Sequence, residues 1–293
     1  MRVFVTGATG LVGSAVVAEL IGHGHAVLAL TRSDAAAAAA ANAGAVPVHG
    51  ALGDIEVLSH AAAEADGVIH LAFSNDFSSP EALSRSVAEE GAALLAMGEA
   101  LIGSGRPIVA VSGTPVLNGR VSTEEDPSVI EGPLSGRGRA VMALLDLSSR
   151  GVRSAAVRLP RTVHNEGKGG FAGLLTNIAR RTQVSGYPGD GSQRWPAVHA
   201  RDAASLFRIV LERADPGTAW HAVDDEGDAV RDIATVIGRR LGLPVQSVSS
   251  EAFGVLGPIF SADQPSSSRK TREVLGWQPT HARLLDDLEL LQP

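Results

Sequence analysis

A glycine-rich segment near the start of the chain has the spacing of a phosphate-binding loop. It runs from Thr6 to Gly13 as Thr-Gly-Ala-Thr-Gly-Leu-Val-Gly, directly after the apolar residues 3–5. The three glycines permit a tight turn, a close main-chain approach to a pyrophosphate and close packing of the following helix, whose first amides then face the anion. The spacing is G-x-x-G-x-x-G and not G-x-G-x-x-G, and the alternative is a glycine-rich turn without a ligand. The pattern predicts a bound dinucleotide, held by Gly7, Thr9, Gly10, Leu11 and Val12.

The residues after the second predicted strand bear on which dinucleotide is bound. That strand ends in Thr31, Arg32 and Ser33. An acidic residue at this place binds both ribose hydroxyls of NAD, whereas an arginine can hold a 2′-phosphate. Arg32 therefore predicts NADPH. NADH stays possible because Asp34 is near enough to face the ribose, and a solvated loop arginine is the alternative role of Arg32.

Composition excludes several other kinds of chemistry. The chain has no cysteine, which rules out disulfides, thiolate metal sites and a cysteine nucleophile. Its formal charge of −7 argues against nucleic acid as a partner. No histidine–carboxylate cluster has a convincing metal-ligand spacing, so we predict no metal. The only tyrosine is Tyr187, and the only lysines are Lys168 and Lys270.

The hydrophobic pattern predicts a protein that does not enter a membrane. No apolar run approaches the roughly 18 residues that span a bilayer. The first apolar run leads straight into the glycine loop, which leaves no room for a signal sequence, so we expect a cytoplasmic location. The sequence leaves the oligomeric state open.

The elements that must position these residues alternate between strand and helix. Short, nearly continuous apolar runs alternate with helical stretches through the first half, as in a parallel sheet covered on both faces. The pattern predicts an α/β fold: a doubly wound parallel (Rossmann) sheet with a smaller, mostly helical C-terminal substrate lobe. The expected strands are 3–5, 26–30, 46–49, 68–71, 108–111, 154–158 and 219–223; the expected helices are 11–21, 35–43, 55–65, 80–102, 140–149, 201–212, 230–241, 250–260, 268–275 and 282–290.

The regular alternation weakens after Pro160. Segments 164–170 and 185–192 are rich in glycine and polar residues, which is typical of loops over a ligand site. We therefore predict a dinucleotide-binding domain of residues 1–160 and 199–223, and a substrate-binding lobe of residues 161–198 and 224–293.

Four segments together resemble the extended short-chain dehydrogenase/reductase family over essentially the whole chain. Beside the glycine loop they are residues 70–73 (His-Leu-Ala-Phe), 111–114 (Val-Ser-Gly-Thr) and 158–160 (Arg-Leu-Pro). The resemblance implies that the second segment lines the cofactor ribose and that residues 159–163 lie against the nicotinamide. Ala51 replaces the family's adenine-contacting aspartate, which leaves packing by Leu52. Further cofactor residues implied in this way are Leu71, Ala72, Phe73, Ser112, Arg139, Leu159, Pro160 and Val163.

The family's usual catalytic residues are a serine or threonine, a tyrosine and a lysine, the last two spaced Y-x-x-x-K. Thr114 falls at the first position, but Ser135 and Arg139 fall where the tyrosine and lysine are expected. The count of residues makes this independent of alignment, because Tyr187 is followed four places later by Gly191. A serine hydroxyl is a much weaker acid than a phenol. Thr114 and Ser135 are therefore candidate hydrogen-bond donors or water relays, and a phenol on the substrate could supply the proton.

The resemblance extends to atypical family members without the tyrosine that reduce ketones of aromatic polyketides. It implies an NADPH-dependent ketoreductase in antibiotic biosynthesis, acting on an angucyclinone-like aromatic ketone. The alternatives are a non-catalytic NADP(H)-binding sensor or regulator, and a nucleotide-sugar epimerase or dehydratase. Candidate substrate contacts are Phe77, Tyr187, Trp195 and His199, although Trp195 could instead cover the domain junction and His199 could substitute as an acid.

Overall fold

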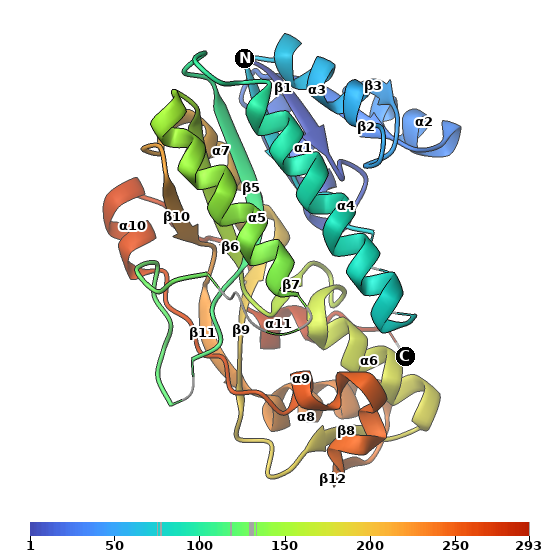
Figure 1. Ribbon diagram of the computed structural model, residues 1–293. Coiled ribbons are helices and arrows are strands. Elements are labelled where there is room, and N and C mark those ends of the chain that lie inside the picture. The colour runs from blue at the N-terminus through green and yellow to red at the C-terminus, as the bar shows by residue number, and fades with distance from the viewer. Residues whose placement is uncertain (75, 77, 118, 129–131, 133, 293) are drawn as a thin grey trace.

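The central feature of the protein is a seven-stranded parallel sheet (Figure 1). The computed structural model describes residues 1–74, 76, 78–117, 119–128, 132 and 134–292. The strand order β10-β6-β5-β4-β1-β2-β3 reverses between β1 and β4, which confirms the doubly wound fold predicted from the apolar runs. The strands are β1 (Arg2–Thr6), β2 (Ala26–Thr31), β3 (Val46–His49), β4 (Gly67–His70), β5 (Pro107–Gly113), β6 (Arg153–Leu159) and β10 (Thr218–His221).

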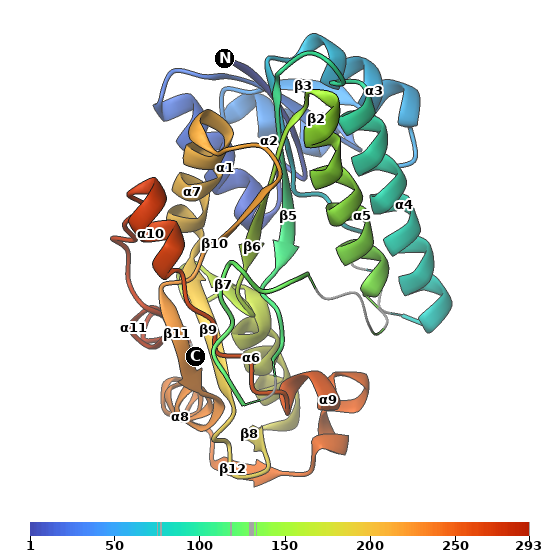
Figure 2. The same cartoon turned by 60° about the vertical axis from the view of Figure 1, so that its left-hand side comes forward.

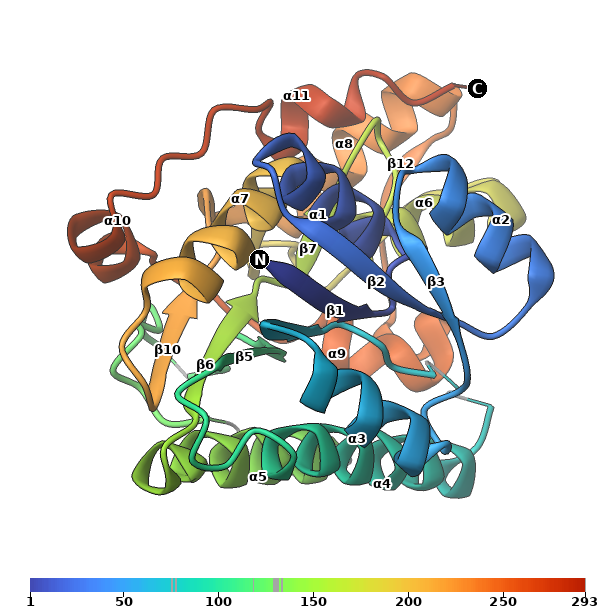
Figure 3. The same cartoon turned by 90° about the horizontal axis from the view of Figure 1, so that it is seen from above.

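Helices cover both faces of this sheet (Figure 3). One face carries α1 (Leu11–Gly22), α2 (Asp34–Asn42) and α7 (Ala200–Arg213); the other carries α3 (Ile55–Glu64), α4 (Pro80–Glu99) and α5 (Ser135–Asp146), which continues into the 3-10 turn η1 (Leu147–Arg150). Strand side chains alternate between the two cores: Val3 and Val5 pack with α1 and α7, whereas Phe4 packs with α3 and α4. Burial on both faces is why these strands are continuously apolar.

A second group of elements lies beyond the carboxyl ends of the central strands (Figure 2). We call this group the small-sheet lobe. It contains a three-stranded sheet in the order β11-β9-β7 and a two-stranded sheet of β12 and β8. The lobe comprises β7 (Thr162–His164), α6 (Gly170–Thr182), β8 (Ser185–Pro188), β9 (Arg194–His199), β11 (Asp225–Ala229), α8 (Val230–Leu241), β12 (Val245–Val248), η2 (Ser250–Leu256), α9 (Gly257–Phe260) and α11 (Leu284–Leu288). The two-domain division with boundaries near 160, 199 and 223 remains our proposal, and these strand memberships are compatible with it.

The C-terminal segment returns to the central sheet. It includes α10 (Arg269–Leu275), followed by Trp277, which is 1% exposed. Trp277 Nε1 donates to the main-chain oxygen of Asp202 and to Ser205 Oγ, each at 3.0 Å. The tail is therefore fastened to α7 on the central sheet.

Three predicted elements differ from the structure. Helix α5 begins at Ser135, five residues before the predicted start, because two glycines in its first turn hid the helical pattern. The segment 250–260 divides into η2 and α9, with Gly254 at φ +58°. Between residues 161 and 199, where we predicted loops at 164–170 and 185–192, the structure has the 13-residue helix α6 and the strands β7, β8 and β9. No helix among the described residues is long and apolar enough to cross a membrane.

Candidate active site

The glycine loop joins β1 to α1 as the sequence predicts. Gly7 has φ +71°, and a Cβ there would lie 2.8 Å from the main-chain nitrogen of Ala72. A Cβ on Gly13 would lie 1.9 Å from the carbonyl oxygen of Gly7. Only glycine allows these close approaches, which draw the start of α1 and the end of β4 onto the loop.

The first turn of α1 is suited to an anion. The N-cap residue is Gly10, so no side chain caps the helix, and no acidic residue stands in the first turn. The first amides of a helix have no partner within the helix and carry its positive partial charge. A Cβ built on Gly10 would have one atom within 4 Å, the Gly7 oxygen at 3.4 Å, so the loop surface there is open. The loop thus fits a dinucleotide pyrophosphate held by the amides of Leu11 and Val12.

A buried hydroxyl connects the glycine loop to the segment after β4. Thr6 Oγ1 accepts hydrogen bonds from the amides of Leu71 (3.2 Å) and Ala72 (3.3 Å) and lies 2.8 Å from His70 Nδ1. Burial, followed by the positive charge of Arg137, lowers the pKa of His70 to about 3. His70 is therefore neutral near pH 7, and Thr6 can donate its proton to Nδ1. These bonds hold Leu71 and Ala72 beside Gly7, and the contact of this segment with the cofactor ribose stays a prediction.

The residues proposed for the adenosine end lie after β2 and β3. Leu52 is 8% exposed and packs in the α3–α4 core, while the amide of Ala51 donates to Asp54 Oδ2 at 2.8 Å. Arg32 is exposed. Ser33 caps α2 by accepting from the amide of Ala36, so Ser33 is committed to the helix. Arg32 directly follows Thr31, the last residue of β2, whereas Asp34 is the first residue of α2.

Arg32 gives the first prediction. If Arg32 holds a 2′-phosphate, Arg32→Ala should raise the KM for NADPH about tenfold or more, while the KM for NADH changes little. Steady-state kinetics or calorimetry with both dinucleotides measures this. Arg150→Ala, in η1 at the opposite edge of the sheet, is the matched control and should leave both constants unchanged. Equal losses for NADPH and NADH in Arg32→Ala would contradict the assignment.

Thr114 lies at the carboxyl end of β5, at the edge of the sheet shared with the glycine loop. It is 3% exposed, and its amide donates to the oxygen of Leu159 at 3.0 Å. Gln264 Nε2 donates to both the main-chain oxygen (2.7 Å) and Oγ1 (3.1 Å) of Thr114. The Thr114 hydroxyl accepts a hydrogen bond from Gln264, so its own proton is available for donation. Ser112 is the penultimate residue of β5 and is half-buried.

Helix α5 presents the residues that stand where the family's tyrosine and lysine are expected. Ser135 is the first residue of α5 and is half-buried, and Arg139 is exposed one turn later. Between them, Arg137 binds the carboxylate of Glu90 through Nε (2.6 Å) and Nη2 (2.7 Å). Its guanidinium lies 4.2 Å from the ring centre of Phe73. Phe73, which belongs to the segment predicted to line the cofactor ribose, is therefore held by a cation–π contact with Arg137.

The residues proposed for the nicotinamide follow β6. Leu159 ends that strand and accepts the Thr114 amide, while Pro160 and Val163 are buried. Gly169 lies against Val163, since a Cβ on Gly169 would be 2.6 Å from the Val163 oxygen. Leu11 also reaches this segment, because the same Cβ would be 2.3 Å from Leu11 Cδ2. The side chain of Leu11 thus faces the small-sheet lobe, and its amide is the group available to a phosphate.

Trp195 does not have the predicted role of stacking on a substrate. Its side chain is fully buried, with ring centres 5.1 Å from Phe260 and 6.1 Å from Phe171. No face remains for a flat ligand, so Trp195 belongs to the core of the small-sheet lobe. Tyr187 is half-buried in β8 against the same core. Phe77 lies outside the described residues.

His199 also has a structural environment that differs from the predicted substrate contact. It is the N-cap of α7, and its Nδ1 accepts from the amide of Arg201 at 3.2 Å. Its ring stacks on His281 at 4.7 Å and meets His164 edge-on at 5.5 Å. Burial chiefly lowers the pKa of His199. The neighbouring His281 forms an ion pair with Asp202 at 2.8 Å.

His199, Asp202 and His281 place ligand atoms within 4.8 Å of one another, a geometry that could hold a metal ion. However, the Asp202 oxygens already accept the amides of Thr280 and His281 at 3.0 Å each. His199 Nδ1 is engaged by Arg201. Because Asp202 binds two amides and the His281 ring of the C-terminal segment, we assign the cluster to fastening that segment onto α7.

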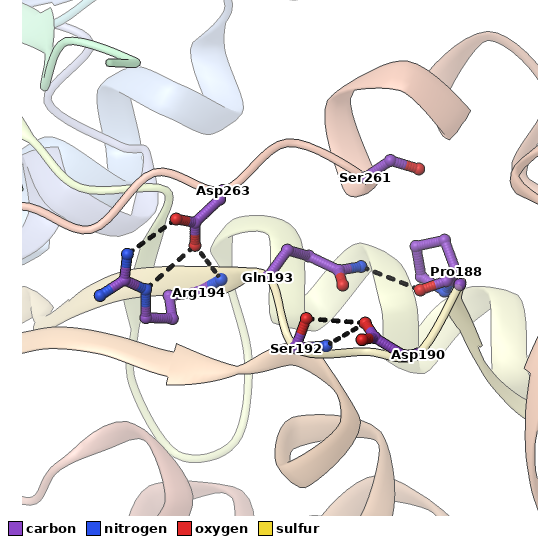
Figure 4. Close-up of a pocket in the computed structure, with 8 residues that line it drawn as sticks. Pro188, Asp190, Ser192, Gln193, Arg194, Ser261 and Asp263 are labelled. Atoms are coloured by element: carbon purple, nitrogen blue, oxygen red, sulfur yellow. Dashed lines mark hydrogen bonds and ion pairs between the residues drawn. The ribbon is translucent and has the colours of Figure 1, made fainter. Parts of the chain in front are cut away.

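A polar pocket of about 490 Å³ opens in the small-sheet lobe (Figure 4). Arg194 and Asp263 form a salt bridge across one wall, with Arg194 Nη2 2.8 Å from Asp263 Oδ2. The next residue, Gln264, contacts Thr114, so the pocket wall leads directly to the carboxyl end of β5. The pocket is lined by Pro188, Gly189, Asp190, Ser192, Gln193, Arg194, Ser261 and Asp263.

Sequence reasoning missed Gln264, the Glu90–Arg137 pair and Asp263. Gln264 is 150 residues from Thr114, and no local pattern marks that contact. The Glu90–Arg137 pair carried a weak signal, since Glu90 occurs on the buried face of a long helix. Asp263 stands in a short segment of mixed polarity that predicts no particular element.

The parallel sheet, the glycine loop and the open first turn of α1 define a dinucleotide-binding α/β protein. The chain belongs to the NAD dependent epimerase/dehydratase family, whose sequence profile matches residues 3–223. This membership confirms the extended short-chain dehydrogenase/reductase family indicated by the sequence, and with it an NAD(P)-dependent oxidoreductase fold.

Relatives extend over nearly the whole chain. An uncharacterized protein of Schizosaccharomyces pombe is 43% identical, with 98% of each chain covered. A 3-diazoavenalumate denitrifying reductase of a Streptomyces species is 29% identical, covering 98% of this chain and 99% of the relative. Among solved structures, the dTDP-glucose 4,6-dehydratase DesIV of Streptomyces venezuelae, with NAD and TYD bound, has a TM-score of 0.79 at 20% identity, covering 99% and 95% of the two chains. The structural likeness supports the fold.

Proposed function

We propose that this protein is an NADPH-dependent reductase of small-molecule aromatic ketones that works without a tyrosine acid. The observation that supports the proposal is the start of α5, where Ser135 and Arg139 lie at the places at which the resemblance leads us to expect the family's tyrosine and lysine. The chain's single tyrosine, Tyr187, is in β8 and packs on the lobe core. Hydride delivery needs no tyrosine base, whereas epimerase and dehydratase chemistry begins by removing a hydroxyl proton. Reduction is therefore the family reaction least affected by this change.

We assign the following roles in cofactor and substrate binding. The amides at the start of α1 bind the pyrophosphate, and Arg32 binds the 2′-phosphate. When bound, NADPH would supply the hydride. Thr114, with its hydroxyl oriented by Gln264, and Ser135 donate hydrogen bonds to the ketone oxygen. Neither hydroxyl is acidic enough to give up its proton readily, so the proton comes from water or from a phenol on the substrate.

The aromatic substrate rests on a resemblance. In its glycine loop and in its lack of the Tyr-Lys dyad, the sequence resembles an angucyclinone ketoreductase of the simocyclinone pathway, and we base the proposed aromatic substrate on that resemblance. The relatives do not support an aromatic polyketide or a role in antibiotic biosynthesis, since a yeast protein is 43% identical over 98% of the chain. The Streptomyces relative is named as a reductase, which agrees with reduction. We therefore propose aromatic ketones in general.

The proposal is tested by NADPH consumption with a panel of aromatic ketones, quinones and nucleotide sugars. Oxidation of NADPH with a ketone supports the reductase. Tight NADPH binding without oxidation across the panel would favour the sensor, and conversion of a nucleotide sugar without net NADPH consumption would favour the epimerase or dehydratase.

The hydroxyl groups give the second prediction. Thr114→Ala and Ser135→Ala should each lower kcat/KM roughly 2- to 13-fold, the value of one neutral hydrogen bond. Ser149→Ala, in η1 beyond the far end of α5, should change nothing. A loss of several orders of magnitude in either active-site variant would show that the hydroxyl is the acid and would contradict protonation by water or substrate.

A further inference from the structure

Arg161 is a buried cation that lacks an acidic partner among the residues that the structure describes. It follows β6 by two residues, and 9% of its surface is exposed. Nη1 donates to the main-chain oxygen of Ile259 at 2.8 Å, and Nε is enclosed without a hydrogen-bond partner among the described residues. Burial alone lowers the pKa of Arg161 to about 10, because no neighbouring carboxylate opposes the effect. A guanidinium has five N–H donors, and one of them is used here.

Arg158, the other buried arginine of the described chain, does not share this situation. Burial lowers the pKa of Arg158, but two nearby carboxylates oppose that shift. The half-buried Arg153 has a pKa that burial lowers, but it lies at the amino end of β6. Arg208 and Arg137 form direct ion pairs with acidic side chains. Buried charges are nearly always paired, since desolvation of a lone ion is costly. The acidic partners are Asp126 and Glu124 for Arg158, Glu19 and Glu212 for Arg208, and Glu90 for Arg137.

The surroundings of Arg161 hold the guanidinium in place without neutralising it. Its central carbon lies 5.2 Å from the ring centre of Phe171 and 5.7 Å from that of Trp195. Aromatic faces attract a cation, but they leave its N–H groups without acceptors. The side chain is thus fixed by packing while most of its hydrogen-bonding capacity remains unused.

Arg161 lies at the end of the central sheet where α/β proteins bind ligands. Parallel α/β sheets bind ligands in the crevice at the carboxyl ends of their strands, and Arg161 follows the carboxyl end of β6. Thr114 occupies the same edge after the adjacent strand β5. Ile259, which accepts from Arg161, is two residues from Ser261 in the wall of the polar pocket.

We propose that Arg161 recognises a carboxylate on the substrate, so that the protein acts on aromatic keto acids. The inference rests on the proposed reductase function and defines its substrate class. A planar carboxylate matches two parallel N–H donors of a guanidinium. One guanidinium balances one negative charge. The pocket offers no free cation for a diphosphate, because Asp263 neutralises Arg194 and Asp190 adds a negative charge.

The test measures binding of 2-naphthoate and of its neutral analogue 2-naphthamide to the complex of the protein with NADP⁺ by calorimetry. We expect wild type to prefer the carboxylate roughly 10- to 100-fold. Arg161→Met should reduce the preference to near one, and Arg161→Lys should keep part of it. Arg153→Met, at the opposite end of β6, is the matched control and should keep it all. 2-Naphthyl phosphate should bind more weakly than the carboxylate.

The stability of the ligand-free variant separates recognition from a structural role. If Arg161 is an unpaired cation, Arg161→Met should melt at the wild-type temperature or above it. The inference is wrong if the two naphthyl probes bind wild type equally or not at all, if the phosphate binds best, if Arg161→Met keeps the preference, or if Arg161→Met melts well below wild type.

Turnover distinguishes this inference from the proposed function. 6-Acetyl-2-naphthoate should be reduced with a kcat/KM at least tenfold above that of 6-acetyl-2-naphthamide, and Arg161→Met should remove the difference. Equal reduction of both ketones by wild type would retain the reductase and overturn the role of Arg161. Selective binding of the carboxylate without reduction of any ketone would retain carboxylate recognition and overturn the reductase.

Discussion

Replacing Gly13 by alanine is expected to abolish dinucleotide binding and to destabilise the fold. The new Cβ would lie 1.9 Å from the carbonyl oxygen of Gly7, a main-chain atom that cannot rotate away. To relieve this clash, α1 must move off the loop, and the amides that we propose for pyrophosphate binding move with it. We expect the Kd for NADPH to rise at least about 100-fold, and overpacking to cost about 1–3 kcal/mol of unfolding free energy.

The control is Gly22→Ala at the other end of α1. A Cβ on Gly22 meets no atom within 4 Å, so this variant should bind NADPH normally and be as stable as wild type or more so. Calorimetry with NADPH and thermal denaturation measure both effects. Wild-type affinity in Gly13→Ala would show that the loop is not the pyrophosphate site.

Arg137→Met is expected to be the most destabilising side-chain replacement near the site. Glu90 is 4% exposed and binds the Arg137 guanidinium in a two-bond arrangement. Burial already raises the pKa of Glu90, and the arginine opposes that shift. Without Arg137 the carboxylate is buried unpaired, which costs about 3 kcal/mol or more. Urea denaturation at pH 8 measures the loss.

The pH dependence identifies the cause of that loss. In Arg137→Met the folded pKa of Glu90 rises further above its unfolded value, so the folded state holds a proton that the unfolded state releases. The loss of stability should therefore grow as the pH rises from about 4.5 to 8. The double variant Arg137→Met/Glu90→Leu should recover most of the stability at pH 8. A loss independent of pH, with no recovery in the double variant, would contradict a buried ion pair.

The central sheet could be predicted from the sequence because its signals are local. Residues 230–241 were predicted as a helix and form α8 with the same bounds, and the first three strands agree within one residue at each end. In contrast, β11 has the sequence Asp-Glu-Gly-Asp-Ala, which has low strand propensity. It is extended because it pairs with β9, a contact that depends on the folded chain.

Parts of the candidate site could not be predicted, because residue type does not determine exposure. Trp195 was predicted to stack on a substrate, and it is buried in the lobe core instead. Arg161 lies within the segment 159–163 that the resemblance places against the nicotinamide, but it received no individual role from the sequence. Its significance comes from what surrounds it in space, namely two aromatic rings and no acid among the described residues.

The late position of α7 in the chain affects folding during synthesis on the ribosome. Strands β1, β4 and β5 are complete by Gly113, but α7, which covers one face of them with α1, begins at Ala200. Through the intervening synthesis, apolar residues such as Ile69 and Val109 on that face have no cover from α7. A growing chain of this kind is open to aggregation and to capture by chaperones. We therefore expect this face of the sheet to be covered only after α7 has been made and the tail with Trp277 has packed on it.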